Sequence, residues 1–411
     1  MKSKSLLPLA LFFITTFAFS QSGQIGGVQY VPITLDNFIS QIDGSNVNIL
    51  AKRRIVDTVA AQQTPMSTFN VSPSMSLTRG SSYLPGQAPS SLTSGVVSPT
   101  TTPQSTTISL SGTIEGWGKR AARSDYYAAE LDRNAVELES LKNAIKMDAA
   151  YSFLDALRYK LAFNSFQNAI VKLKNLKADQ AADNMSRDQF NAANDLKYYS
   201  YAMTTFLSKG QVGLLEPVAN IDTVSARQFD LGSLIESATK NRGDVQSLVK
   251  SVKSAEMSLE LARKNRNMSV TPSVWVSRTP GYDYSTSVYE NKTTATGFSL
   301  SIPLPTNLLF NADLVEAANT LSNAQDYLDD LKVRVAVEVN QAYMQYGYAV
   351  DKLNAAQSDY VYAQKNNSAN NVDAVFNLRE REGFLIDAKI NHAKALVYLL
   401  KVSGQYEIPK L

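Results

Sequence analysis

The feature that most constrains the fold of this chain is a stretch of about 90 residues without a helix breaker. Neither Pro nor Gly occurs between Lys119 and Lys209, so no residue there interrupts a helix. Ala recurs at seven-residue spacing, which is typical of helices that pack lengthwise. The positions are Ala121, Ala128, Ala135, Ala149 and Ala156. We expect one helix over residues 118–183, about 95 Å long, and such a rod needs long partners to bury its seam.

A second stretch of the same kind occupies residues 306–366. Gly347 is the only Gly or Pro within residues 311–366. Apolar residues again keep a seven-residue spacing, at Leu321, Leu328, Val335, Ala342, Ala349, Ala356 and Ala363. Two matched long helices, one in each half of the chain, indicate a duplicated unit.

Four segments instead show the period of two that is typical of strands. They are residues 67–78, 106–115, 269–278 and 292–304. In residues 106–115, for example, Ile108 and Leu110 alternate with Ser109. Each strand is therefore predicted to have one apolar face and one face rich in Ser and Thr.

These segments occur in the same order twice. The first repeat, residues 34–207, contains an opening helix that starts after Thr34 and continues to about Gln63. The strands 67–78 and 106–115, the long helix 118–183 and a return helix 187–207 follow. A linker, residues 208–229, leads to the second repeat, residues 230–404. That repeat contains an opening helix over about 231–266, strands 269–278 and 292–304, the long helix 306–366 and a return helix 373–402. Residues 405–411 form a tail.

The first 20 residues have the pattern of a secretory signal peptide. Lys2 and Lys4 precede an apolar segment, residues 6–19, and Ala18 and Ser20 supply the small residues that are typical of a cleavage site. We expect cleavage before Gln21 and export of the chain. No apolar run of 18 or more residues follows, so a membrane-spanning part of the mature chain would consist of strands.

The strands have the length of tilted membrane-spanning strands, and a Ser- and Thr-rich second face suits a water-filled lumen. Four strands are too few to close a barrel, and lipid tolerates no open sheet edge. Three chains that share one barrel would supply twelve strands. The alternative is a water-soluble sheet beside a helical bundle, as in a soluble periplasmic or surface scaffold built on coiled coils, and alternation alone leaves it open.

Composition argues against several other classes of protein. The chain has no Cys and a single His, His392, which excludes disulfides and zinc sites of the Cys/His type. The mid-helix position of His392 indicates a surface or packing residue. Lys and Arg number 40 against 37 acidic residues, and two of the Lys lie in the leader. This balance provides no electrostatic footprint for nucleic acid. No nucleophile-elbow or phosphate-loop pattern is present, so we expect no enzyme, no catalytic residue, no bound metal and no cofactor.

The order of these segments and their duplication resemble those of the TolC family of outer membrane efflux and secretion channels. Residues 109–111 lead through residues 116–118 into one long helix, and residues 299–304 lead into the other. The predicted turn between each long helix and its return helix is followed by an Asp and an Ala-rich helix. These turns are at Ser186-Arg187-Asp188 and Asn371-Val372-Asp373. The resemblance implies a homotrimer: a duplicated long-helix coiled-coil bundle plus four transmembrane strands per chain in a shared 12-stranded barrel. It also implies location in the outer membrane and the periplasm, contact with outer membrane lipid, and a passive exit duct without enzymatic activity. Such a duct docks to a periplasmic adaptor and an inner-membrane pump, in a tripartite efflux pump or a type I secretion system. The linker 208–229 and the tail would contribute to a belt around the middle of the periplasmic tunnel.

The same resemblance implies that acidic residues narrow the tunnel at its periplasmic tips. Asp188 and Asp373 occupy the corresponding positions, and three copies of each would form rings that select cations. The alternative is that each Asp complements the dipole of a helix N-terminus. Some members of the family also have a second Asp three residues on, and an Arg and a Tyr before it. Here Phe376, Ala369 and Gln364 take these places, so Phe376 is predicted to form an apolar constriction instead.

Overall fold

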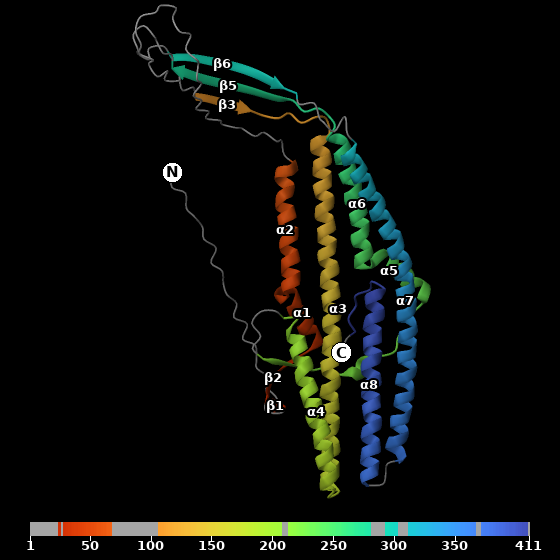
Figure 1. The fold of residues 1–411 in the computed structure, drawn as a ribbon. Helices are drawn as coiled ribbons and strands as arrows, with labels where there is room; N and C mark the ends of the chain where they lie inside the picture. The colour runs from red at the N-terminus through yellow and green to blue at the C-terminus, as the bar shows by residue number, and fades with distance from the viewer. Residues whose placement is uncertain are drawn as a thin grey trace, which may run out of the picture. The chain divides into compact units, whose positions relative to one another are not determined.

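The computed structural model describes residues 24–25, 28–67, 106–207, 213–280, 292–302, 311–366 and 371–409 (Figure 1). The described chain is mainly helical and divides into two compact units. The first unit comprises the described parts of residues 1–51, 141–242 and 334–411, and the second comprises those of 52–140 and 243–333. The predicted strand 67–78 lies outside the described residues except for Ser67, which ends a helix.

The opening helix of each half is broken at the same place. Helices α1 (Leu35–Ser45) and α2 (Val47–Ser67) have 11 and 21 residues, and α5 (Leu231–Asn241) and α6 (Gly243–Lys264) have 11 and 22. The predicted helix start after Thr34 is confirmed. Thr34 is the N-cap of α1, because its side chain accepts a hydrogen bond from the Asn37 amide. Asp230 caps α5 in the same way, by accepting from the Ser233 amide.

The prediction of one continuous opening helix in each half was wrong. Asn46 has an extended backbone, and its side-chain oxygen accepts hydrogen bonds from the amides of Asn48 and Ile49, so it restarts the helix as a cap. Arg242 is also extended, at ψ 131°. Neither position holds Pro, which is why helical periodicity alone missed both breaks.

The long helices are present in both halves. They are α3 (Lys119–Asn175, 57 residues) and α7 (Ala312–Asn366, 55 residues), and the return helices are α4 (Asp179–Thr204) and α8 (Val372–Val402). The seven-residue seam of α7 is confirmed from Val335 onward, where Val335, Ala342, Ala349 and Ala363 are buried. In α3 it holds for Ala149 and Ala156, whereas Ala121 and Ala135 are exposed.

The turn between α3 and α4 lies at residues 176–178, earlier than predicted. Lys177 adopts a left-handed conformation at φ 57°. The amide of Ala178 donates to the carbonyl of Leu173, and the amide of Lys177 donates to the carbonyl of Lys174. These two bonds form a Schellman motif. The expected boundary of the long helix at residue 183 was therefore wrong, because residue 183 lies inside α4. Ser186 also lies inside α4, where its hydroxyl donates to the carbonyl of Ala182.

The first unit contains a small sheet that is not among the predicted strands. Strands β1 (Gln24–Ile25) and β2 (Val28–Ile33) are antiparallel, and β2 pairs in parallel with β4 (Leu214–Pro217). A short 3₁₀ helix, η1 (Ile221–Thr223), follows β4. In the core of this unit Phe38 is fully buried and contacts the rings of Phe153 and Phe206, each with ring centroids 6.3 Å apart.

The second unit contains the sheet that the alternating segments predicted. Its strands are β3 (Thr106–Ser111), β5 (Thr271–Pro280) and β6 (Lys292–Ser301), antiparallel in the order β3-β5-β6. Ile108 lies opposite Val276, and Val274 lies opposite Phe298. Beyond the end of β3, Ile114 forms an isolated bridge with Val270. Over the described part of the chain, no helix is both long enough and apolar enough to cross a bilayer.

Candidate functional site

One face of the β3-β5-β6 sheet is apolar and exposed. Residues that lie opposite each other in neighbouring strands point to the same face of the sheet, and these pairs place the apolar side chains on one face. The members of this apolar face are Ile108, Leu110, Ile114, Val274, Val276, Phe298, Leu300 and Ile302, and all of them are exposed. A monomeric soluble protein rarely exposes a contiguous apolar surface of this kind. An exposed apolar face of this kind is typical of a surface that contacts a membrane or another protein.

The opposite face of the same sheet is lined by hydroxyl groups. The hydroxyl of Thr107 donates to that of Ser277 at 3.0 Å, and the hydroxyls of Ser273 and Ser299 lie 2.6 Å apart. Between these pairs the indole of Trp275 lies over Gly297, where an added Cβ would collide with the ring. Because hydroxyl groups hydrogen-bond water readily, this hydroxyl face suits contact with solvent.

Asp373 and Phe376 lie at the start of α8, as predicted. Asn371 caps the helix, since its side-chain oxygen accepts from the Ala374 amide at 2.7 Å. Asp373 is exposed in the first turn, and Phe376, one turn later, is 39% exposed. Val372 and Val375 point the other way and pack against a core cluster of α3 and α4 that includes Leu173 and Met185. The start of α8 thus presents Asp373 and Phe376 outward and holds them by its apolar side.

Asp188 does not lie at a helix start. It is the tenth residue of α4, because the turn lies at residues 176–178, so it is about 13 Å along the helix from its first residue. The premise that Asp188 and Asp373 occupy equivalent tip positions is wrong in this respect. Asp188 is exposed, and its carboxylate acts electrostatically on Arg379 of α8.

Arg379 is the charged residue that connects these helices. Its guanidinium lies 3.6 Å from the centroid of the Phe166 ring of α3, a cation–π contact. Burial lowers the pKa of Arg379, while the carboxylates of Glu382, Asp188 and Asp387 act in the opposite direction. A Cβ at Gly383, one turn further on, would lie 2.6 Å from the Nη1 atom of Arg379. No local pattern in the sequence marks this contact, because Phe166 and Arg379 lie more than 200 positions apart.

A cavity of about 310 Å³ lies beside Arg379. Its lining includes Arg158 and Tyr159 of α3, and Arg379, Phe384 and Asp387 of α8. The Nε of Arg158 is 2.7 Å from an Oδ1 of Asp387. On the same pair of helices the hydroxyl of Ser165 donates to Glu382 at 2.5 Å. The next arginine of α8, Arg381, pairs instead with Asp359 of α7 at 3.6 Å.

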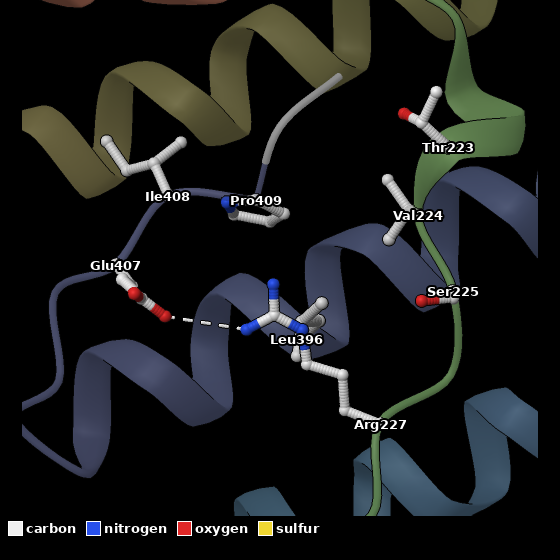
Figure 2. Close-up of a pocket in the computed structure, with 8 residues that line it drawn as sticks. All are labelled: Thr223, Val224, Ser225, Arg227, Leu396, Glu407, Ile408 and Pro409. Atoms are coloured by element: carbon white, nitrogen blue, oxygen red, sulfur yellow. Dashed lines mark hydrogen bonds and ion pairs between the residues drawn. The ribbon is translucent and has the colours of Figure 1, made fainter.

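The linker and the tail face each other across a second cavity of about 300 Å³ (Figure 2). Its lining residues are Thr223, Val224, Ser225, Arg227, Leu396, Glu407, Ile408 and Pro409. The Nη1 of Arg227 lies 3.5 Å from Oε2 of Glu407. Both side chains are exposed, so this ion pair contributes little to stability. The cavity holds no cluster of groups suited to catalysis.

His392 is a packing residue, one of the two roles that its place in the sequence indicated. It is 1% exposed and lies beside the Tyr346 ring, with centroids 5.5 Å apart. Its Nε2 has no hydrogen-bond partner in the described part of the protein. Burial lowers the pKa of His392. Within the described ranges, no three His, Cys, Asp or Glu side chains are grouped as ligands for a metal ion.

Similarity to known proteins lies in the fold and not in the sequence. No protein-family model matches the sequence, and no curated protein is detectably similar to it in sequence. Among solved structures, the fold is similar to that of CusC, with a TM-score of 0.65 and 14% identity over 90% of this chain and 92% of CusC. It is also similar to the CmeC outer membrane channel of Campylobacter jejuni, with a TM-score of 0.64 and 15% identity over 92% of this chain and 87% of CmeC. The open state of the MtrE outer membrane channel of Neisseria gonorrhoeae gives a TM-score of 0.61 and 13% identity, over 90% of this chain and 88% of MtrE.

Nearly the whole chain therefore has the fold of these outer membrane channels. The TolC-like fold expected from the order of sequence elements is confirmed.

Proposed function

We propose that this chain, which shares its fold with outer membrane channels, is one subunit of a passive trimeric exit duct. In this proposal three copies supply a 12-stranded barrel in the outer membrane, and their long helices form a tunnel in the periplasm. The first 20 residues act as a signal peptide that is removed on export. The duct is not an enzyme and requires no cofactor.

The observation that carries this proposal is the two-faced sheet. Its apolar face is exposed along all three strands, and its hydroxyl face carries hydrogen-bonded Ser and Thr pairs. Lipid outside and water inside a barrel require this division of side chains. A coiled-coil scaffold in water would leave the apolar face unexplained, which makes it the less favoured function.

The fold that this chain shares with outer membrane channels also supports a proposal about its partners. Two of the similar structures are described as outer membrane channels. We propose that the duct docks to a periplasmic adaptor and an inner-membrane pump, in a tripartite efflux pump or a type I secretion system. The transport energy then comes from the pump.

The proposed constriction consists of Asp373 and Phe376, with Asp188 further along the tunnel. Threefold symmetry would turn each exposed Asp into a ring of like charges, which attracts cations and repels anions. Phe376 would narrow the same region with an apolar ring.

The test is the mass of the protein extracted from outer membranes in mild detergent, with the detergent contribution subtracted, followed by conductance in planar bilayers. The expected result is a trimer that forms cation-selective pores. A monomer without conductance, or a protein released from cells without detergent, would overturn the duct and leave the soluble scaffold.

A further inference from the structure

The turn between β3 and α3 presents the most exposed aromatic side chain of the described chain. Trp117 is 91% exposed. It lies between Gly116 and Gly118, where the chain leaves the β3 region and enters the long helix. An indole in this position would normally be buried, because it removes a large apolar area from water when covered.

The turn is built so that Trp117 projects outward. Gly118 has a left-handed backbone at φ +81°. An added Cβ at Gly116 would collide with the carbonyl oxygen of Met268. The side-chain amide of Asn267 donates to the carbonyl of Trp117 at 2.6 Å. These constraints hold the backbone in place, so the exposure of the indole is a property of the fold.

The apolar face of the sheet ends at this turn. Ile114, at the end of that face, is 58% exposed, and Met268 is 51% exposed. Ile114 bridges to Val270, so the two chain segments around the turn, residues 113–123 and 260–270, lie side by side. Trp117 and Met268 therefore form the last apolar side chains before the helices begin.

Basic residues follow immediately on the helix side. We name the group Lys119, Arg120, Arg263, Lys264 and Arg266 the basic edge. Lys119 donates to the Ser269 hydroxyl at 3.0 Å, and the carbon chain of Lys264 lies over Gly118. These two contacts place Lys119 and Lys264 beside the turn that carries Trp117.

The acidic residues near the basic edge offset part of its charge. Glu115 is engaged by Arg123, through two contacts of 2.5 and 3.0 Å. Glu260 is shared by Arg263 and Lys264, at 3.6 and 3.2 Å. Asp313 and Glu316, at the start of α7, are two further carboxylates of this unit. Residues 113–123 and 260–270 each carry two more basic than acidic residues, and Asp313 and Glu316 reduce this combined excess of four to two.

We propose that Trp117, Met268 and the basic edge bind anionic phospholipid headgroups of the bilayer leaflet on the helix side of the sheet. This inference rests on the proposed function, because it requires the apolar face to lie in a membrane. Indole rings favour the boundary between acyl chains and headgroups. Lys and Arg next to that boundary attract anionic headgroups, and Lys264 reaches it with its carbon chain packed on Gly118. In this arrangement the apolar face lies at the level of the acyl chains, Trp117 lies at the interface, and the basic edge lies at the level of the headgroups.

Quenching of Trp117 by brominated lipids tests this directly. The chain has two Trp, so Trp275→Phe leaves Trp117 as the only indole. The trimer is reconstituted into bilayers that contain either phosphatidylglycerol or phosphatidylcholine with bromine on the acyl carbons near the headgroup. We expect both lipids to quench Trp117, and phosphatidylglycerol to do so with about tenfold higher apparent affinity.

Charge removal identifies the side chains responsible. In the same background, Arg120→Gln with Arg263→Gln should reduce the preference for phosphatidylglycerol by about fivefold or more. The matched control removes two exposed charges from α4, by Arg187→Gln with Lys197→Gln, and should leave the preference unchanged. If Trp275→Phe fails to assemble, the difference in quenching between the wild-type chain and Trp117→Phe reports the same contact.

The possible results distinguish failure of the lipid site from failure of the proposed function. Equal quenching by the two lipids, in trimers that conduct ions, overturns the anionic preference and leaves the proposed function standing. Absence of quenching in conducting trimers places Trp117 outside the bilayer and overturns the lipid site. Absence of both trimer and conductance overturns the proposed function, and the lipid site with it.

Discussion

The hydroxyl of Tyr346 hydrogen-bonds both main-chain groups of Arg227: it accepts from the amide at 2.7 Å and donates to the carbonyl at 3.0 Å. Tyr346 is 4% exposed and belongs to α7, whereas Arg227 belongs to the linker between the repeats. Phe229 covers the edge of the same ring, with centroids 5.5 Å apart. A single side chain thus anchors the linker to a long helix.

Tyr346→Phe should release the linker at Arg227. The substitution leaves a main-chain donor and acceptor without partners, at a cost of about 1–3 kcal/mol. If trypsin cleaves after Arg227 only when the linker opens, the cleavage rate should rise about fivefold or more. Mass spectrometry of the fragments measures it. Tyr348→Phe, an exposed residue of the same helix, is the control, and equal cleavage in both variants would show that the anchor is unimportant.

His392 should make the protein less stable at mildly acidic pH. Burial lowers the pKa of His392 below its ordinary value of 6.5, so the unfolded chain binds a proton more readily than the folded one. The stability from the neutral imidazole is fully present above about pH 6.5 and decreases as the pH falls towards the folded pKa, by about 1.4 kcal/mol for each pH unit between the two pKa values. Because His392 is the only His, His392→Phe should reduce the loss of thermal stability between pH 7.5 and 5.5. An unchanged pH dependence would contradict the prediction.

Charge on the apolar face should prevent membrane assembly. Phe298→Arg places a cation on a side chain that is 68% exposed on that face, at a cost of about 2–4 kcal/mol if it lies near the bilayer midplane. Ala295→Arg, on the same strand but on the hydroxyl face, is the matched control. We expect trimers from outer membranes of the control and few from Phe298→Arg. Normal trimers from both variants would show that the apolar face does not contact lipid.

Ion selectivity should depend on Asp373. Asp373→Asn removes three charges from a symmetric trimer, so the ratio of cation to anion permeability should fall, whereas Asp373→Glu should preserve it. Reversal potentials in a salt gradient measure this ratio. Phe376→Ala, in contrast, should raise single-channel conductance without changing selectivity. If neither property changes in these variants, the start of α8 does not line the constriction.

Sequence patterns predicted those parts of the fold that rest on local chemistry. The helix start at Thr34 follows from a side chain that accepts a main-chain amide, and the sheet faces follow from alternation. The turn at Lys177 was missed because a Lys in the left-handed region has no sequence signal, unlike the Gly that normally occupies it. The pairing of β2 with β4 was missed because it joins segments almost 200 residues apart, and strands of six and four residues carry little periodicity.

For the same reason, the position of Asp373 in the candidate site was predicted correctly and that of Asp188 was not. Asp373 follows a cap that the sequence displays, so its place at the start of α8 was predictable. Asp188 follows Ser186, which looks like a cap but bonds within α4. Its true neighbour, Arg379, becomes apparent only once the two helices pack together, because the contact with Phe166 joins residues more than 200 positions apart.

The breaks at Asn46 and Arg242 bear on how the chain evolved. They divide the two opening helices into segments of nearly equal length, 11 and 21 residues against 11 and 22. The residues at the breaks share no chemistry: one is an amide that caps the next helix, and the other is an arginine followed by Gly243. Ancestry from a single duplicated gene would therefore be recorded in the spacing of helix ends rather than in the side chains that produce each end.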